Sequence, residues 1–290
     1  MVVAYNSRDD LRGAIEPLLE SLDLHVVVVD NASADRSLEV VADLDVTTLA
    51  LDRNGGFAHG CNHGWRLGRA PFVLFLNPDA RIDPASVAIL RSALERNERI
   101  GIVAPRIENA DGSLAYSQRR FPRLRSTFAR AFFLHRLLPR VGWTDELVRD
   151  AAAYTVRRRV DWVAGACLLV RRSTLERIGG WDDGFFHYGE DIDLCRRVAE
   201  EGFEVWFEPA ATVRHAGGAS APRSALLPRL AESQLRYARK HGGRVFFSMQ
   251  RFGLALGLVT HVIAGRGGPA VRAGRLGALK VLLTGRRGAS

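Results

Sequence analysis

Short runs of apolar residues, each ending in a polar side chain, glycine or proline, recur through the first third of this 290-residue chain. The runs occupy residues 26–29, 47–51, 72–76 and 102–104. Helical patterns separate them, notably at residues 9–22 and 84–97, the second with Asp83 as a candidate N-cap. Continuous apolar runs alternating with helices are typical of a parallel sheet covered on both faces. We therefore predict an α/β fold.

Two aspartates lie just after two of these runs. In open α/β sheets ligands bind beyond the carboxyl ends of the strands, so Asp30 and Asp79 are candidate binding residues. The stretch that begins at Asp30 is also compatible with a helix-capping turn, and Asn77-Pro78-Asp79 with an ordinary turn. Both alternatives stay open on the sequence alone.

The second half of the chain is less regular. In residues 109–160 apolar runs no longer alternate with helical patterns. We interpret this stretch as an insertion with an apolar helix at 128–138. A buried strand at 162–170, a helix at 191–201 and a short last strand at 203–207 are predicted after it, with His215 on a following loop.

The cysteines and the first residues of the chain indicate the cellular compartment in which the protein is expected. Cys61, Cys167 and Cys195 are widely spaced and odd in number, which argues against a disulfide framework or a zinc site and favours a reducing cytoplasm. The first residues enter a strand pattern without a charged and then apolar leader, so no secretory signal is predicted.

The net charge of +9 is concentrated at the C-terminus. Residues 216–290 carry 13 Arg or Lys and one acid, whereas the first 215 carry 28 basic and 31 acidic residues. Long apolar stretches interrupt these basic residues, which is typical of a helix on a membrane surface, although a solvated basic face is the simpler alternative. Residues 245–264 are long enough to span a membrane, but Arg251 and His261 within them argue against a span. On an interfacial helix, Arg251 is expected to point to phosphates.

Residues 185–193 place three carboxylates and three aromatic side chains around a glycine at the start of a helical pattern. Glu190 and Asp191 are adjacent, and neighbouring carboxylates raise each other's pKa, which suits a group that accepts a proton. Asp193 and Arg196 fall on the helix, where capping and a salt bridge explain them.

Five segments in this order resemble the family 2 glycosyltransferases, and within them the bacterial rhamnosyltransferase group: Val27 to Ser33, Phe75 to Ala80, Trp162 to Ala166, Phe185 to Arg197 and Arg214 to Gly218. The resemblance implies a GT-A fold, which is a Rossmann-like, mixed and mostly parallel sheet flanked by helices. It implies a catalytic domain at residues 1–215, followed at 216–290 by a basic, amphipathic helical region. The insertion then lies beside the acceptor groove.

The resemblance also implies a metal site. Asp79 stands at the second acid of the family's D-x-D signature, Asn77 replaces the first, and His215 is at the position that completes the metal sphere. Mn²⁺ or Mg²⁺ is expected to bridge the diphosphate of the donor, and an imidazole ligand favours Mn²⁺. A lone histidine is otherwise explained as a surface or core residue.

The donor site follows from the same likeness. Asp30 is expected to reach the base and ribose, and a carboxylate can accept from the imide N–H of thymine or uracil, so a dTDP or UDP sugar is predicted. The other predicted nucleotide-binding residues are Tyr5, Asn6, Asn54, Gly56, Phe57, Asn62 and Asn77.

On the acceptor side, the resemblance assigns Asp191 as the general base. The residues expected to bind the acceptor or sugar are Glu190, Trp162, Gly165, Ala166 and Tyr188. A buried tryptophan is as readily a core residue, so Trp162 is open to both interpretations.

The resemblance thus implies a metal-dependent inverting glycosyltransferase. L-Rhamnose from dTDP-rhamnose is the favoured donor, with another UDP or dTDP sugar as the alternative. The acceptor is expected to be a glycan or a polyprenyl-diphosphate-linked sugar used in cell-envelope polysaccharide synthesis. The protein is predicted to be cytoplasmic and peripheral on the anionic inner face of the plasma membrane, with a homo-oligomer left open. Binding of nucleic acid by the basic tail is the alternative from another class, but it leaves the acids at strand ends unexplained.

Overall fold

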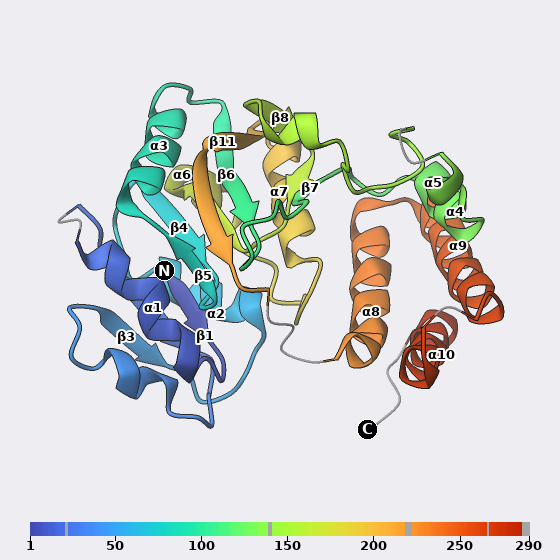
Figure 1. The fold of residues 1–290 in the computed structure, drawn as a ribbon, viewed down its shortest axis with the longest axis horizontal. Coiled ribbons are helices and arrows are strands. Elements are labelled where there is room, and N and C mark those ends of the chain that lie inside the picture. The colour runs from blue at the N-terminus through green and yellow to red at the C-terminus, as the bar shows by residue number, and fades with distance from the viewer. Residues whose placement is uncertain (21–22, 139–140, 218–221, 266, 286–290) are drawn as a thin grey trace. The chain divides into compact units, whose positions relative to one another are not determined.

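The computed structural model describes residues 1–20, 23–138, 141–217, 222–265 and 267–285. The chain divides into two compact units (Figure 1). The first consists of Met1–Arg119, Asp150–Phe186 and Glu190–Gly218, and the second of Arg120–Arg149, His187–Gly189 and Ala219–Ser290. Residues 120–149 therefore share a unit with the C-terminal helices.

A sheet organises the first unit. Among the described residues its strands follow the order β3-β2-β1-β4-β10-β6-β11-β5, with β8 also paired to β11. The strands are β1 (Val2–Ala4), β2 (Val27–Asp30), β3 (Thr47–Ala50), β4 (Phe72–Leu76), β5 (Ala80–Ile82), β6 (Ile100–Glu108), β8 (Arg158–Val160), β10 (Cys167–Arg171) and β11 (Glu204–His215). β10, β5 and β8 run antiparallel to their neighbours and the others share one direction. The predicted mixed, mostly parallel sheet is confirmed.

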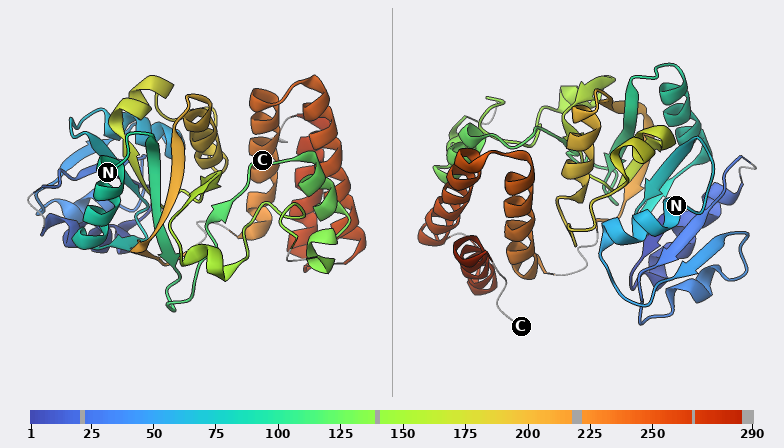
Figure 2. Two further views of the ribbon diagram at one scale, coloured as in Figure 1. Left: turned by 90° about the horizontal axis from the view of Figure 1, so that it is seen from above. Right: turned by 180° about the vertical axis from the view of Figure 1, so that it is seen from behind.

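Helices cover both faces of this sheet, as Figure 2 shows from two directions. α1 (Arg8–Leu19) and α3 (Pro84–Glu95) bury their apolar stripes in the main core on one face. On the other face α2 (Phe57–Trp65) approaches so closely that a Cβ on Gly60 would lie 2.6 Å from Val3. α7 (Glu190–Glu200) packs on β6 and β11. The remaining short helices of the unit are η1 (Ser37–Val41), η2 (Ala151–Tyr154) and α6 (Arg172–Ile178).

Local sequence signals account for several element ends. The side chain of Asp83 accepts a hydrogen bond from the Ser86 N–H at 2.7 Å, which confirms the predicted N-cap of α3. Cys61, Cys167 and Cys195 are buried free thiols, consistent with the expected lack of a disulfide framework.

The single strand predicted at residues 162–170 is wrong. The chain forms β9 (Trp162–Val163), turns at Gly165 and resumes as β10. β9 pairs instead with β7 (Gln118–Arg119) in a separate two-stranded sheet. Apolar composition alone did not reveal the break, because buried turn residues beside a site are as apolar as strand residues.

The predicted last strand at 203–207 is too short, because β11 continues to His215. It pairs first with β6, passes an irregularity between Glu208 and Thr212, and then also pairs with β5. His215 is thus the last residue of a strand, opposite Ala80, and not part of a loop.

The second unit is helical. Its elements are α4 (Leu124–Ala131), α5 (Leu134–Leu137), α8 (Arg223–His241), α9 (Arg244–Ile263) and α10 (Pro269–Thr284). A small apolar core joins α8 to α10 through Ala231, Leu235, Ala278, Val281 and Leu282. The helix predicted at 128–138 is two shorter ones, because Phe133 adopts a left-handed conformation with φ of 60°. A buried hydrogen bond of 2.8 Å from Thr127 to Gln250 fixes α4 on α9.

Arg251 does not point outward as expected. Its guanidinium donates to the backbone carbonyls of Leu282 and Leu283 at the end of α10. There the positive charge interacts favourably with the negative end of the α10 dipole, so the orientation of Arg251 has a structural explanation within the second unit. By length and composition alone, α9 is a helix that could cross a membrane.

Candidate active site

Asp79 and His215 meet at one end of the sheet. Asp79 Oδ1 lies 3.1 Å from His215 Nε2, and the side-chain nitrogen of Asn77 lies 3.5 Å from the same ring nitrogen. The antiparallel register of β5 and β11 causes this meeting, because Ala80 is opposite His215 and the Ala216 N–H donates to the Asp79 carbonyl at 3.1 Å. The three residues predicted around the cation are therefore neighbours.

This pair fits a divalent cation whose coordination is completed from outside the protein. One carboxylate oxygen and one imidazole nitrogen are suitable ligands for Mn²⁺, and both side chains are partly exposed. Within the described ranges no group of three or more His, Cys, Asp or Glu side chains forms a metal cluster. Asp79 and His215 are thus the two candidate ligands that these residues offer to a cation.

One carboxylate oxygen of Asp30 accepts a hydrogen bond, and among the described residues the other has no partner. Oδ2 accepts from the Ser33 N–H at 3.1 Å and closes a local turn. This turn caps no helix, because the next helix, η1, has Arg36 as its N-cap residue, so the helix-capping interpretation is wrong. Oδ1 is buried and has no hydrogen-bond partner among the residues that the structure describes. A buried acceptor without a partner is costly unless a ligand or water completes it, so the binding hypothesis for Asp30 is compatible with the same geometry.

The first strand ends in a tight turn beside Asp30. Asn6 has φ of 50°, its N–H donates to Ser33 Oγ at 2.9 Å, and its side chain accepts from the Ala34 N–H at 2.9 Å. Asn6 therefore positions the loop that follows Asp30. Tyr5 is 47% exposed and leaves its ring open to a ligand.

The glycine-rich loop before α2 lies against the segment that leads to Glu190. Gly56 has φ of 92°, and a Cβ there would lie 2.4 Å from the carbonyl oxygen of Phe186. The Phe57 N–H donates to the same oxygen at 3.3 Å, while Asn54 Oδ1 accepts from Gly56 and Asn31. The loop is thereby fixed by backbone contact, which only glycine permits at Gly56.

Asn62 is engaged within the protein. Its side chain donates to Trp181 O and to Asp183, and accepts from the Trp181 N–H and the Trp65 ring nitrogen. All hydrogen-bonding positions of this amide are used, so the structure shows it fastening α2 to residues 181–183. A nucleotide contact by Asn62 stays a prediction.

Glu190 and Asp191 begin α7 after two consecutive left-handed residues. Tyr188 has φ of 65° and Gly189 has φ of 89°. A left-handed tyrosine is uncommon and locally strained, and such strain concentrates at functional sites. Tyr188 is 36% exposed, and its ring lies 4.1 Å from that of His187.

Three successive contacts link Asp191 to the candidate metal ligands Asp79 and His215. Its Oδ2 accepts from the Gly165 N–H at 3.3 Å, and the neighbouring Ala166 carbonyl accepts from the Asn77 N–H at 2.9 Å. Asn77 in turn reaches His215. A Cβ on Gly165 would lie 3.3 Å from Asp191 Cβ, so the glycine allows the carboxylate to approach. The turn at 164–166 thus connects the proposed base with the proposed metal ligands.

Burial perturbs both carboxylates. Burial, with the charge of Asp191 added, raises the pKa of Glu190 to about 8. Glu190 is 9% exposed and its Oε2 has no partner among the described residues, so the neutral acid is favoured at pH 7. Burial also raises the pKa of Asp191, against the hydrogen bond from Ile192 and the positive charge of Arg119. Glu190 can therefore donate a hydrogen bond while Asp191 accepts a proton.

Trp162 and Arg119 form the wall beside α7. Trp162 is 9% exposed, and the guanidinium carbon of Arg119 lies 5.2 Å from the centre of its ring. The sequence analysis did not select Arg119, because only the pairing of β7 with β9 brings it to Trp162. Its position in a cluster of arginines before Pro122 was the available signal.

Further along α7, the charged side chains are structural. Asp193 is fully buried and pairs with Arg197 at 2.7 Å, while Arg196 pairs with Glu200 at 2.7 Å. Arg197 also donates to the carbonyls of Ile178 and Gly180. These contacts agree with the salt-bridge interpretation.

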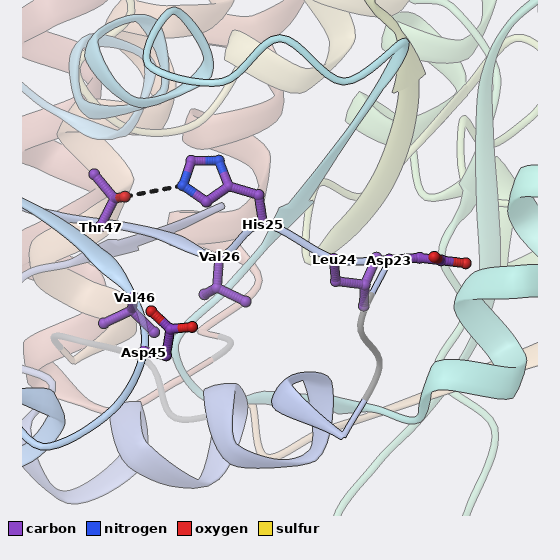
Figure 3. Close-up of a pocket in the computed structure, with 7 residues that line it drawn as sticks. All are labelled: Asp23, Leu24, His25, Val26, Asp45, Val46 and Thr47. Atoms are coloured by element: carbon purple, nitrogen blue, oxygen red, sulfur yellow. Dashed lines mark hydrogen bonds between the residues drawn. The ribbon is translucent and has the colours of Figure 1, made fainter.

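The pocket drawn in Figure 3 lies elsewhere. It is lined by Asp23, Leu24, His25, Val26, Asp45, Val46 and Thr47, with a hydrogen bond of 2.9 Å between His25 and Thr47. These residues precede or begin β2 and β3, whereas Asp30 ends β2. The length of a four-residue strand, ~13 Å, separates the pocket from the carboxyl edge. It has no part in the site described above.

Comparison with known proteins identifies the chain. A model described as glycosyl transferase family 2 matches residues 1–176, and one described as the N-terminal domain of galactosyltransferase matches residues 146–216. The class of protein is thus a glycosyltransferase enzyme. More particularly, the chain belongs to glycosyl transferase family 2.

Two relatives confirm the resemblance to the rhamnosyltransferase group. The N-acetylglucosaminyl-diphospho-decaprenol L-rhamnosyltransferase of Mycobacterium tuberculosis is 32% identical over 220 residues, covering 69% of this chain and 71% of that protein. The rhamnosyltransferase WbbL of Escherichia coli K12 is 28% identical over 211 residues, covering 68% of this chain and 76% of the relative.

Solved structures confirm the GT-A fold. The mannosyltransferase PcManGT from Pyrobaculum calidifontis, in complex with GDP-Man and Mn²⁺, has a TM-score of 0.59 at 17% identity, covering 98% of this chain and 86% of the other. Residues 1–349 of S. aureus TarS, in complex with UDP-GlcNAc, have a TM-score of 0.57 at 14% identity, covering 97% and 79%.

Proposed function

We propose that this glycosyltransferase is metal-dependent and inverting, and that it moves L-rhamnose from dTDP-rhamnose to a glycan or polyprenyl-diphosphate-linked sugar in cell-envelope polysaccharide synthesis. The observation that carries this proposal is the contact path from Asp191 through Gly165, Ala166 and Asn77 to His215 and Asp79. This path supports the proposal that Asp191 takes the proton close to Asp79 and His215, two side chains suited to hold a cation. The names of the rhamnosyltransferase relatives support the choice of sugar and acceptor.

Donor binding follows from the ends of β1, β2 and β4. Asp30 has a buried oxygen that can accept the imide N–H of thymine or uracil, and the exposed ring of Tyr5 can stack on a base or ribose. Asp79 and His215 would hold Mn²⁺ or Mg²⁺. The bound cation would supply positive charge to the departing diphosphate.

The transfer is a single displacement. The acceptor oxygen forms a bond to the anomeric carbon while the bond from that carbon to the diphosphate oxygen breaks, and the electron pair leaves with the diphosphate. Asp191 takes the hydroxyl proton. Glu190, neutral because of burial, holds the acceptor by a hydrogen bond, and Trp162 presents an apolar face to a sugar ring.

We also propose that the second unit binds the anionic inner membrane surface. One face of α9 exposes Val245, Met249, Phe252, Val259 and Ile263, the largest fractions being 74% and 79% at the two ends. Their spacing of three, four or seven residues forms one stripe ~27 Å long. The ring of Phe252 lies 6.2 Å from that of Phe128, and Phe132 and Leu137 of the same region are also exposed. An apolar stripe in a basic segment suits a peripheral membrane helix.

The function is tested by combining purified protein with dTDP-rhamnose, other dTDP and UDP sugars, and an N-acetylglucosaminyl diphosphate that carries a short alkyl chain. Transfer of rhamnose with inversion at the anomeric carbon, lost on addition of EDTA and restored by Mn²⁺, is expected. Transfer with retention, or full activity in excess EDTA, would contradict the proposed mechanism. Preference for another nucleotide sugar would correct the proposed donor, while the proposed inversion and metal dependence would stand.

A further inference from the structure

Arg119 is a half-buried cation with unused hydrogen-bond donors. Its guanidinium carbon lies 5.2 Å from the centre of the Trp162 ring, and its backbone is fixed by the pairing of β7 with β9. In the part of the chain that the structure describes, its guanidinium has neither a hydrogen bond nor an ion pair. The adjacent Gln118 shows the contrast, because its side chain donates to the Ala153 carbonyl at 2.8 Å.

The segment from Trp162 to Cys167 orders the groups of the site. Arg119 lies over the ring of Trp162 at the start of the segment. Asp191 accepts a hydrogen bond from Gly165 in the middle, and Asn77 donates one to Ala166 near the end. Four residues span at most ~14 Å. Asp191 is therefore between Arg119 and the pair formed by Asp79 and His215 along this segment, and β9 packs directly on α7.

The order of these groups along the segment indicates which substrate Arg119 would contact. In an inverting displacement the acceptor approaches from the side opposite the leaving diphosphate, and the base is on the acceptor side. In the proposed function, Asp79 and His215 would hold the cation that binds the donor diphosphate at one end of the segment, so a group at the other end would meet the acceptor. A planar guanidinium positioned over an indole presents a fork of donors that matches phosphate oxygens.

We propose that Arg119 binds the diphosphate of a lipid-linked acceptor sugar while Asp191 takes the proton from a hydroxyl of that sugar. The width of one sugar ring separates an anomeric phosphate from the hydroxyl that attacks. Arg119 and Asp191 flank the same short segment, and the positive charge of Arg119 acts on Asp191. This inference rests on the proposed function, because it takes the acceptor to be a sugar diphosphate. It adds the residue that distinguishes such an acceptor from a neutral glycan.

The test compares two acceptors and four proteins. The probes are an N-acetylglucosaminyl diphosphate with a short alkyl chain and the alkyl N-acetylglucosaminide with the same chain and no phosphate. The proteins are the wild type, Arg119→Gln, Arg119→Lys and the control Arg158→Gln, which changes an exposed arginine on β8 of the same unit. KM and kcat for each acceptor, KM for the donor, and equilibrium binding of the diphosphate probe are measured, with thermal melting as the check on folding.

Arg119→Gln should raise KM for the diphosphate acceptor roughly tenfold or more, because a charged pair of hydrogen bonds is lost. Values for the neutral acceptor and for the donor should stay within twofold of wild type. Arg119→Lys should recover part of the loss, since it keeps the charge without the fork, and Arg158→Gln should match the wild type.

Equal losses on both acceptors would overturn the proposal and indicate that Arg119 acts through Asp191 instead. A raised donor KM would overturn it in favour of the donor diphosphate. Should Arg119→Gln not fold, an unchanged KM in the lysine variant, together with unchanged binding, would overturn it as well. Wild-type protein that binds the diphosphate probe through Arg119 but transfers no sugar would contradict the proposed function and leave the assignment of Arg119 to the diphosphate standing.

Discussion

The carboxylate of Asp191 accepts a hydrogen bond of 3.3 Å from the backbone N–H of Gly165, in a turn whose next residue is bonded to Asn77. Backbone atoms that are fixed by the sheet thus set the distance between the proposed base and the proposed metal ligands. The account of catalysis depends on this spacing.

Removal of either cation ligand should weaken metal-dependent donor binding. Asp79→Ala is expected to have the larger effect, because it removes a negative charge as well as a lone pair, and His215→Ala the smaller. The measurement is the thermal shift that dTDP produces with and without Mn²⁺, since stabilisation follows occupancy. Asp83→Ala, which removes a helix cap in the same region, is the control and should lower the melting temperature without changing the shift. Equal shifts in the Asp79 variant and the wild type would exclude Asp79 as a ligand.

Glu190 should make the protein less stable as the pH rises. Its pKa is raised to about 8 in the folded state by burial, whereas the unfolded value is near 4.5, so between these values the unfolded state releases a proton that the folded state keeps. The associated stability is fully present below pH 4.5 and is lost as the pH rises through 8. Glu190→Gln removes this dependence.

The difference in melting temperature between Glu190→Gln and wild type should therefore shift in favour of the variant from pH 5 to pH 8. The control is Glu200→Gln on the exposed side of the same helix, which should show no such trend. A constant difference over this range would show that Glu190 is ionised in the folded protein.

Activity should decline on the acid side at a pH above that of an ordinary aspartate. Burial raises the pKa of Asp191, and only its ionised form accepts a proton. The pH profile of kcat/KM for the acceptor gives the midpoint of this limb. A midpoint at or below the ordinary value of about 3.9 would mean that the folded protein does not raise the pKa of the base.

Gly56→Ala should destabilise the first unit. The residue has φ of 92°, and the new Cβ would lie 2.4 Å from a backbone oxygen, so the loop before α2 must move. A loss of about 1–3 kcal/mol is expected in denaturant unfolding. Gly68→Ala is the matched control, because its Cβ would meet no atom closer than 3.5 Å. Equal stabilities of the two variants would contradict the close approach of Phe186.

The apolar stripe on α9 should determine binding to membranes. Phe252→Glu combined with Ile263→Glu replaces two residues that are 63% and 79% exposed, so folding should be preserved while sedimentation with anionic liposomes falls. Leu230→Glu, which is 38% exposed on α8, serves as the control. Binding should also weaken at high salt, because part of it comes from basic residues. Unchanged sedimentation of the double variant would remove the stripe from the membrane proposal.

The sequence allowed the sheet, its covering helices and the N-cap at Asp83 to be predicted, because strand composition and helical spacing are local signals. It placed His215 on a loop and joined residues 162–170 in one strand, because the extension of β11 and the turn at Gly165 depend on pairing between distant strands. The same limitation applies to Arg251 and Arg119, whose partners are 31 and 43 residues away in the chain.

The most direct test of the account is the rate of sugar transfer by Asp191→Asn. The amide keeps the shape of the side chain but cannot accept the proton, so we predict a loss of roughly 100-fold or more in kcat. Affinity for the donor, measured by thermal shift with Mn²⁺, should stay within a few-fold of wild type. If the variant keeps more than about a tenth of wild-type activity, Asp191 is not the general base.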